Sequence, residues 1–455
     1  AMTGRSVEAA RASLDRLTRV TLAEPTAPDR YGMHDLLRDY ARGLAATNDT
    51  PDRRSQALTR LLDYQFAACA VVTTLLPAKT TPPRVPAPAV DVPLPAPGDA
   101  AAARAWLDAE RPGLVRSIVH AAEHGFHQHA VALAETLWLY LNYGNHLDEG
   151  SAASASALHA ARAGGDRTGE SIALMNMAGV LFSRGRTAES ADHMDRALDA
   201  IREGDDPETE ALILINLGVV ERFLGKLSEA VTHTGEALDL WRSTGNLVGQ
   251  AHALTQLGYL LLNSGDRPRA EEYLLSALAV ATESGDLRSI GDAHEVLGEV
   301  FVAADRLELA AEHCERALSC MEESGSLLEQ RSPTLVRLGG IRLRQGLHEQ
   351  AQAHFDEALA AFDGVTNRTY LVSALNGLGE VYRVTGDHRQ ALDHYVRALV
   401  VAEEIENVAE QIVAHQGLAA VYRDTGDSAS ADRHVARARE LGDSIATAET
   451  PRAGR

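Results

Sequence analysis

Apolar and small residues recur along this chain with a period of about 40 residues. A leucine, or a methionine in the first copy, stands directly before a small residue that occurs seven times in register. These small residues are Ala178, Gly218, Gly258, Gly298, Gly339, Gly379 and Ala419. Two further columns, almost entirely alanine, follow twelve and nineteen residues later. Such a period predicts a solenoid, in which each unit leaves an apolar face that only its neighbour can cover.

Within each unit, the apolar residues fall at helical spacing in two stripes. The stripes of the second unit are Leu214, Leu217, Val220 and Leu224, then Ala230, Ala237 and Leu238. A glycine, or Asp305 in the fourth unit, separates the stripes and suits the left-handed conformation that ends a helix. Between units, pairs such as Gly165-Asp166 and Gly204-Asp205 stop one helix and offer an oxygen to cap the next. Each unit is therefore predicted to be a helical hairpin, with the first small residue letting its two helices approach closely.

The composition favours a helical protein and argues against some partners. The chain has 455 residues, 45% hydrophobic but only 5% aromatic, and a net charge of -21. Most of the negative charge lies in the repeats, so we expect no nucleic-acid binding by them. No stretch reaches the roughly 18 apolar residues of a membrane span, and no signal peptide opens the chain. We therefore expect a cytoplasmic protein without membrane contact.

The repeat columns resemble the tetratricopeptide repeat. That family's pattern of small and aromatic positions reads here as Leu378, Gly379, Tyr382, Gly386, Ala391 and Ala398. The usual unit has about 34 residues, and the longer unit here fits longer helices, as in a longer variant of the family. The resemblance covers residues 164–442, and a degenerate unit precedes it.

In this family the first helix of each hairpin lines a concave groove. Carried over by register, the resemblance implies a ligand- or peptide-binding set of amide, charged and tyrosine side chains. This set is Asn176, Asn216, Arg222, Gln256, Tyr259, Asn263, Glu299, Arg337, Arg344, Asn376, Glu380, Arg383, Gln416 and Arg423. Amides pair with a peptide backbone and guanidinium forks hold carboxylates, so the arginine-bearing half would favour an acidic segment. The alternative is that many of these residues are only solvated positions on a helix face.

Histidine forms a column fifteen residues after the small residue. The column reads His193, His233, Tyr273, His313, His354, His394 and His434. It flanks the alanine columns, and neighbouring copies would lie roughly 10 Å apart at helix-packing distance, too far to share a metal. We therefore expect a half-buried packing position rather than a metal or pH-sensing site. A second cluster, at His120, His124, His127 and His129, lacks a completing carboxylate or cysteine, so no metal site and no cofactor is expected.

Residues 1–47 do not follow the repeat. They predict a helix from Val7 running into a short strand, a second short strand around Tyr31–Met33, and another helix. This order resembles the end of the winged-helix domain in signalling ATPases of the NB-ARC (STAND) class, and Met33-His34-Asp35 matches their MHD motif. The resemblance implies that His34 and Asp35 sense nucleotide when an ATPase core is present, with His34 contacting the phosphate of ADP.

Together, these segments resemble bacterial transcriptional regulators of the AfsR/SARP type. A GxxxxGK[ST] loop is missing, since Gly225-Lys226 is followed by Leu227, so the chain alone is not expected to grip nucleotide phosphates. We expect the C-terminal part of a longer protein. Its fold class is all-α, a tetratricopeptide-repeat superhelical solenoid preceded by a partial winged-helix segment and a helical linker region. The expected parts are residues 1–47 (partial winged helix with the MHD motif), 48–76 (helical connector), 77–100 (proline-rich linker), 101–163 (helical region with a degenerate repeat), 164–442 (seven repeats) and 443–455 (flexible tail).

The function predicted from these parts is binding and signalling. The chain has no GxSxG, no HExxH and no paired cysteine ligands, so we expect no enzymatic activity. The preferred hypothesis is an effector-sensing and protein-interaction module of a STAND-type regulator. Its repeats would bind a protein, a peptide segment or a small-molecule effector and control the adjoining ATPase core of the same longer protein. The alternative is a stand-alone tetratricopeptide scaffold that binds peptide segments of partner proteins.

Overall fold

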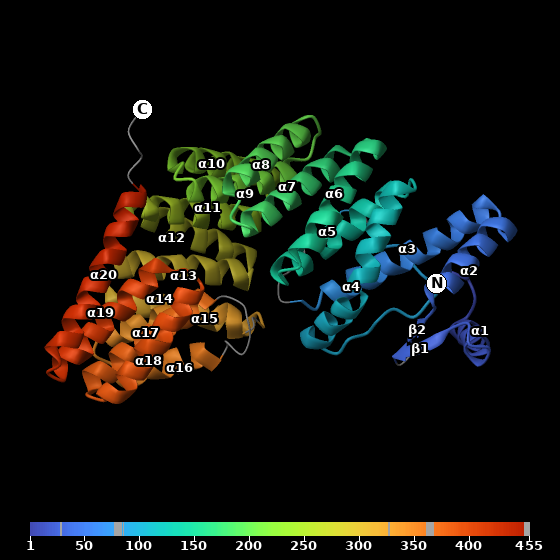
Figure 1. Cartoon of the computed structure of the whole chain (residues 1–455). Coiled ribbons are helices and arrows are strands. Elements are labelled where there is room, and N and C mark those ends of the chain that lie inside the picture. The colour runs from blue at the N-terminus through green and yellow to red at the C-terminus, as the bar shows by residue number, and fades with distance from the viewer. Residues whose placement is uncertain (28–29, 77–83, 85, 326–327, 361–367, 450–455) are drawn as a thin grey trace, which may run out of the picture. The chain divides into compact units, whose positions relative to one another are not determined.

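The chain folds into consecutive helical hairpins, as the computed structural model in Figure 1 shows. It describes residues 1–27, 30–76, 84, 86–325, 328–360 and 368–449. The regular secondary structure of these residues is helical, apart from one two-stranded sheet near the N-terminus. The chain divides into two compact units, residues 1–240 and 241–455. The predicted all-α class is confirmed.

The first 48 residues form the predicted helix, two strands and helix. The elements are α1 (Val7–Arg19), β1 (Glu24–Ala27), β2 (Arg30–Gly32) and α2 (Asp35–Asn48). The two strands are antiparallel, with Pro25 opposite Tyr31. The second strand thus begins and ends one residue earlier than the sequence indicated.

Four longer helices lead into the repeats. They are α3 (Pro51–Thr73), α4 (Ala100–Glu123), α5 (His127–Tyr143) and α6 (Leu147–Gly164). Thr50 and Asp99 cap α3 and α4 by accepting hydrogen bonds from backbone N–H groups of the first turn. The proline-rich segment falls between these two helices, and its residues 77–83 and 85 lie outside the described residues. α5 and α6 pack together as a hairpin at the place of the degenerate unit.

Seven hairpins follow along the repeats. They are α7 (Arg167–Ser183) with α8 (Thr187–Arg202), α9 (Pro207–Phe223) with α10 (Leu227–Thr244), α11 (Leu247–Asn263) with α12 (Arg267–Ser284), α13 (Leu287–Ala303) with α14 (Leu307–Glu323), α15 (Leu328–Arg344) with α16 (His348–Ala360), α17 (Arg368–Thr385) with α18 (His388–Glu404), and α19 (Val408–Asp424) with α20 (Ser428–Glu449). The last helix corrects the expected flexible tail, because it continues beyond residue 442. Gly442 lies inside this helix and does not adopt the positive φ of the glycines in the turns, so it does not end the helix. Residues 450–455 lie outside the described residues.

The turns among the described residues use the predicted residues, with one exception. Within the hairpins the turn residues have positive φ, including Asp305 at 58°. Between hairpins, Asp166 caps α7, since its Oδ1 accepts from the N–H of Gly169 at 2.9 Å. The expectation that Asp205 caps the following hairpin is wrong. Asp206 does so, accepting from the N–H of Thr209 at 3.0 Å, and Pro207 then occupies the first helical position.

The small-residue column has the predicted packing role. A Cβ atom placed on Gly258 would lie 2.5 Å from Cγ of Leu274, on the other helix of the same hairpin. At Gly298 the corresponding distance is 2.8 Å, to Sγ of Cys314. The second-helix alanines, such as Ala270 and those in register with it, are fully buried. The hairpins that carry glycine in this column are therefore closed by a contact that leaves no room for a larger residue.

All six histidines of the column are half-buried, as expected for a packing position. Two of them contact a second histidine, which the sequence analysis did not predict. Nδ1 of His313 lies 2.8 Å from Nδ1 of His294, and the His415–His434 pair repeats this contact at 2.9 Å. The other five units carry leucine where His294 and His415 stand.

Histidines of the second cluster contact one another and a neighbouring helix. His120 and His124 stack with ring centroids 3.9 Å apart, and Nε2 of His129 lies 2.9 Å from Oδ1 of Asp63. Over the described ranges, no three His, Cys, Asp or Glu side chains are placed to hold a metal ion. None of the helices in the described part of the chain has the length and hydropathy needed to cross a membrane.

Candidate ligand-binding site

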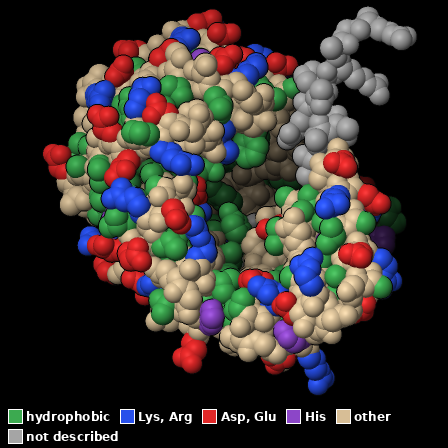
Figure 2. Space-filling model, turned by 90° about the vertical axis from the view of Figure 1, so that its left-hand side faces the viewer, with side chains coloured by type: hydrophobic (Ala, Val, Ile, Leu, Met, Phe, Trp, Pro, Cys, Tyr) green, Lys and Arg blue, Asp and Glu red, His purple; other side chains and the backbone are tan. Residues whose placement is uncertain are grey.

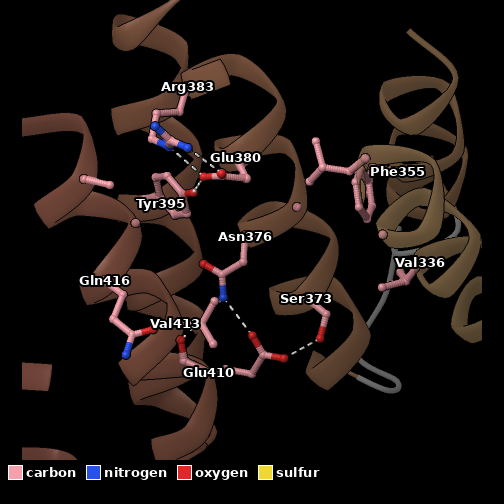
Figure 3. Close-up of a pocket in the computed structure, with 15 residues that line it drawn as sticks. Val336, Phe355, Ser373, Asn376, Glu380, Arg383, Tyr395, Glu410, Val413 and Gln416 are labelled. Carbon is pink, nitrogen blue, oxygen red and sulfur yellow. Dashed lines mark hydrogen bonds and ion pairs between the residues drawn. The ribbon is translucent and has the colours of Figure 1, made fainter. Parts of the chain in front are cut away.

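A pocket of about 500 Å³ lies on the first helices of the last three hairpins, α15, α17 and α19. Figure 3 shows side chains of all three helices directed toward it. Four of the residues predicted for the groove line this pocket: Asn376, Glu380, Arg383 and Gln416. The register carried over from the repeat family therefore brings together the candidates at this end of the array.

Two aromatic rings reach the pocket from second helices. Phe355 on α16 and Tyr395 on α18 are each 2% exposed, yet both line the pocket. Each ring lies against a glycine of the following hairpin. A Cβ on Gly377 would lie 2.3 Å from Cζ of Phe355, and a Cβ on Gly417 would lie 2.1 Å from Cε1 of Tyr395. The rings thus occupy space that a side chain on the next first helix would fill.

This arrangement is restricted to the end of the array. Earlier hairpins carry larger residues in the column of Gly377 and Gly417: Asn176, Asn216, Gln256, Val296 and Arg337. The earlier positions equivalent to the two rings hold Met194, Thr234, Leu274 and Cys314. Aromatic ring and glycine therefore occur together, and both depart from the rest of their columns.

One polar network in the pocket is already closed. The Arg383 guanidinium donates to both carboxylate oxygens of Glu380, at 2.8 and 2.6 Å, and to Asp424 at 2.8 Å. The Tyr395 hydroxyl donates to Glu380 at 2.9 Å. Although burial acts to raise it, the hydrogen bonds from Arg383 and Tyr395 hold the pKa of Glu380 below its ordinary value. Burial, followed by the charge of Glu380, raises the pKa of Tyr395.

A second network surrounds a carboxylate without a cation. Asn376 donates to Oε2 of Glu410 at 2.7 Å, and the Ser373 hydroxyl donates to Oε1 (Figure 3). The first turn of α19 positions this carboxylate, because the N–H of Glu410 is held by Asn407 at 3.1 Å. Among the described residues, no Arg, Lys or His forms an ion pair with Glu410. Oδ1 of Asn376 is buried and has no hydrogen-bond partner.

The expectation that the arginine-bearing half favours an acidic segment is not supported. Arg337 is bound to Glu295 at 3.0 Å and to Glu299, while Arg344 is bound to Asp305 and Arg383 to the network above. Arg423 is exposed. Figure 2 shows acidic and basic side chains intermingled on one face of the molecule, with hydrophobic side chains in its hollow. Three of the four guanidinium groups are thus already neutralised by carboxylates of the chain itself.

Other predicted groove residues between residues 241 and 455 lie outside the pocket. Glu299 and Arg337 form an ion pair that joins α13 to α15. Burial, followed by the charge of Glu295, raises the pKa of Tyr370. Tyr259 also acts on Tyr370 electrostatically, and its carbonyl accepts from Asn263 at 3.0 Å. Gln256 is half-buried. Arg337, Glu295, Glu299, Tyr259 and Tyr370 thus form a second polar cluster outside the pocket.

The predicted groove residues between residues 1 and 240 also lie outside the pocket. Asn216 donates to the carbonyl of Leu212 in its own helix at 2.9 Å. The Arg222 guanidinium lies over the ring of Phe223, 4.3 Å from its centroid. Asn176 is 3% exposed and its Oδ1 has no hydrogen-bond partner.

The MHD segment is exposed at the start of α2. Nδ1 of His34 accepts from the N–H of Leu36 at 3.4 Å, and Asp35 pairs with Arg38 at 3.0 Å. Both His34 and Asp35 are open to solvent. Both side chains are therefore accessible at the surface, with Asp35 held in an exposed ion pair.

Sequence reasoning missed Ser373, Glu410, Phe355 and Tyr395. Glu410 lies at the beginning of its helix, where an acidic residue is normally explained as a cap. The two rings belong to second helices, which the family pattern assigns to packing. The available signal was the change to glycine at residues 377 and 417, in a column that is otherwise occupied by larger side chains.

Comparisons with known proteins identify the repeats. Residues 169–360 match the model of the MalT-like TPR region, and residues 330–404 and 370–444 match a tetratricopeptide-repeat model. The regulatory protein AfsR of Streptomyces griseus is 32% identical over 194 residues, which are 40% of this chain and 19% of that regulator. The matched segment therefore spans about a fifth of the regulator.

Two solved structures share the fold. The STAND protein PH0952 of Pyrococcus horikoshii, described as having a tetratricopeptide repeat sensor, superposes with a TM-score of 0.64 at 14% identity. That match covers 95% of this chain and 59% of PH0952. The apo quorum sensor NprR of B. thuringiensis gives a TM-score of 0.53 at 13% identity, over 74% of this chain and 99% of NprR.

Proposed function

We propose that this chain, which carries tetratricopeptide repeats and is similar over part of its length to AfsR regulators, is a non-catalytic sensor. An effector binds in the pocket on α15, α17 and α19, and the repeats pass that event to an adjoining nucleotide-binding switch. The observation that carries the proposal is the pocket itself, which combines apolar walls with a buried amide oxygen, Oδ1 of Asn376, that has no hydrogen-bond partner.

The N-terminal segment supports the link to a nucleotide switch. Met33-His34-Asp35 has the sequence of the MHD motif, and His34 is exposed where it begins α2. Arg30 on the preceding strand is paired with Glu110 on α4, so the segment is held against the helices that lead into the repeats. A partial winged helix in this place would present His34 to nucleotide on a neighbouring ATPase core.

Effector binding can change the state of the switch because the pocket spans three hairpins. Each hairpin supplies part of its wall, so an effector that fits the pocket fixes the orientation of the three hairpins relative to one another. An effector shifts a conformational equilibrium only by its difference in affinity for the two states. We propose that hairpin orientation is what distinguishes the two states.

A stand-alone peptide-binding scaffold remains the second candidate, because the groove columns contain the amide side chains that such scaffolds use. The coding sequence upstream of residue 1 separates the two. An in-frame GxxxxGK[ST] motif before it favours the sensor.

Binding to the ATPase core tests the proposal directly. The full chain would be titrated calorimetrically with a separately produced nucleotide-binding core of an AfsR-type regulator loaded with ADP. We expect binding that His34→Ala weakens about tenfold, through loss of a charge-assisted contact. His159→Ala, which removes an exposed histidine on α6, is the matched control and should bind like the wild type. Absence of any interaction would refute the switch function.

A further inference from the structure

The pocket on α15, α17 and α19 contains more acceptor than donor capacity. We infer that it takes a ligand bearing a protonated amine or a guanidinium group beside an apolar part, with Glu410 as the anionic partner. This inference rests on the proposed ligand-binding role of the pocket and names the chemistry of that ligand.

The first step is the balance of charge. Arg383 is held by two carboxylates, Glu380 and Asp424, so this group carries one net negative charge. Glu410 adds a second, and no cation among the described residues pairs with it. The pocket is therefore electronegative although it contains an arginine.

The second step is hydrogen-bond capacity. A carboxylate has about four acceptor sites, and Glu410 uses two of them, for Ser373 and Asn376. Asn376 is 5% exposed, and its Oδ1 has no partner within the chain. A buried carbonyl oxygen without a donor is costly, so a ligand that donates there is favoured. Ammonium and guanidinium groups carry several N–H donors and no acceptor, which matches this need.

The third step is the apolar wall. Val336, Leu343, Phe355 and Val413 line the same pocket. Figure 3 shows Val413 beside Glu410 and Asn376. A ligand with an alkyl or aromatic part next to its cation would bury that part here, while the cation remains at Glu410.

An anionic ligand fits the site poorly. The Arg383 guanidinium makes its three described hydrogen bonds to Glu380 and Asp424. These bonds raise the pKa of Arg383, with the bond to Glu380 as the largest cause. Two of its five N–H donors remain, but an incoming carboxylate or phosphate would meet a group that already carries one net negative charge, and it would also approach the unpaired carboxylate of Glu410.

The experiment compares cations with neutral isosteres on the full chain. One pair of probes is hexylammonium and 1-hexanol, and the other is acetyl-Arg-Leu-amide and acetyl-citrulline-Leu-amide. Dissociation constants would be measured by ligand-observed NMR. We expect at least one cation to bind about tenfold more tightly than its neutral isostere, as charge-assisted bonds are roughly twice as strong as neutral ones. Preference in the alkyl pair indicates a free amine, and preference confined to the peptide pair indicates a basic side chain.

Two variants assign the effect to Glu410. Glu410→Gln keeps the shape and the acceptor for Asn376 but removes the charge, so the preference for cations should disappear. Glu403→Gln makes the same change at an exposed residue of α18 and should retain the full preference. Circular dichroism confirms that both variants fold. Equal binding of cations and neutral isosteres by the wild type, or an unchanged preference in Glu410→Gln, would overturn the inference. Neither result bears on the titration with the ATPase core, so the two proposals can fail separately.

Discussion

Gly417→Ala tests whether the ring of Tyr395 depends on a missing side chain. The added methyl group would lie 2.1 Å from Cε1 and 2.2 Å from Cζ of Tyr395. Carbon atoms in contact are separated by about 3.5–4.0 Å, so ring and helix must move apart by more than 1 Å. The ring is enclosed on its other side, because a Cβ on Gly379 would lie 2.9 Å from it.

The size of the effect follows from two losses. Overpacking of a closed core costs about 1–3 kcal/mol. A displaced Tyr395 also loses its 2.9 Å hydrogen bond to Glu380, and a bond to a charged group is worth about 1.5–3 kcal/mol. Alanine has the higher helix propensity, by about 1 kcal/mol, which offsets part of this. We expect a net loss of about 2–4 kcal/mol, allowing for partial relaxation of the ring.

Urea denaturation followed by circular dichroism measures this loss. Gly340→Ala is the matched control, since no atom lies within 4 Å of the added Cβ. It should leave the unfolding midpoint unchanged or raise it slightly, through the same helix propensity. The double variant Tyr395→Ala/Gly417→Ala removes the ring, so the alanine at 417 should no longer destabilise. Additive effects of the two changes would refute the packing described here.

Three further predictions follow from other contacts. Gly258→Leu should lower the melting temperature by a loss of about 1–3 kcal/mol, because Leu274 lies 2.5 Å from the added Cβ; an unchanged temperature would contradict the hairpin contact. Burial, followed by the charge of His313, lowers the pKa of His294 to about 4, so the unfolded chain binds the extra proton more readily between pH 6.5 and 4. Stability should therefore fall by about 1 kcal/mol from pH 6.5 to 5, after allowance for solvent screening. His294→Leu, which restores the residue of the other repeats, should reduce this dependence in pH-resolved melts. Calorimetry with ATP or ADP should show no binding to the isolated chain. Micromolar affinity would contradict the prediction that this chain alone cannot hold nucleotide phosphates.

The sequence predicted the periodic part of the fold because the packing contacts are periodic. Gly258 and its equivalents are small for a reason that repeats every unit, and the half-buried histidine column follows from the same geometry. The elements before the repeats were also predictable from local signals, to within one residue at β2.

The candidate site was predicted only in part, because it is made where the periodicity fails. Asn376, Glu380, Arg383 and Gln416 were found by register, since first helices face the groove. Whether an arginine is free or paired depends on side chains of the neighbouring repeat, and one column of the repeat pattern does not show them. Arg337, which pairs with Glu295 of the preceding repeat, is an example. Tyr395 can enter the pocket only because Gly417 has no side chain. This contact depends on two repeats together and cannot be read from either one alone. The helix to Glu449 was not predicted because glycine often follows the end of a helix, whereas Gly442 lies inside this one.

The pairing of each ring with the next unit's glycine also means that the repeats are not interchangeable. Phe355 requires a glycine in the unit that follows it, and so does Tyr395. If the sixth unit were moved ahead of the fifth, Tyr395 would meet Arg337 instead of Gly417. Deletion of the fifth unit would place Cys314 opposite Gly377 and leave a void. The order of the last units is therefore encoded in their side chains, and an engineered array that shuffles them must move ring and glycine together.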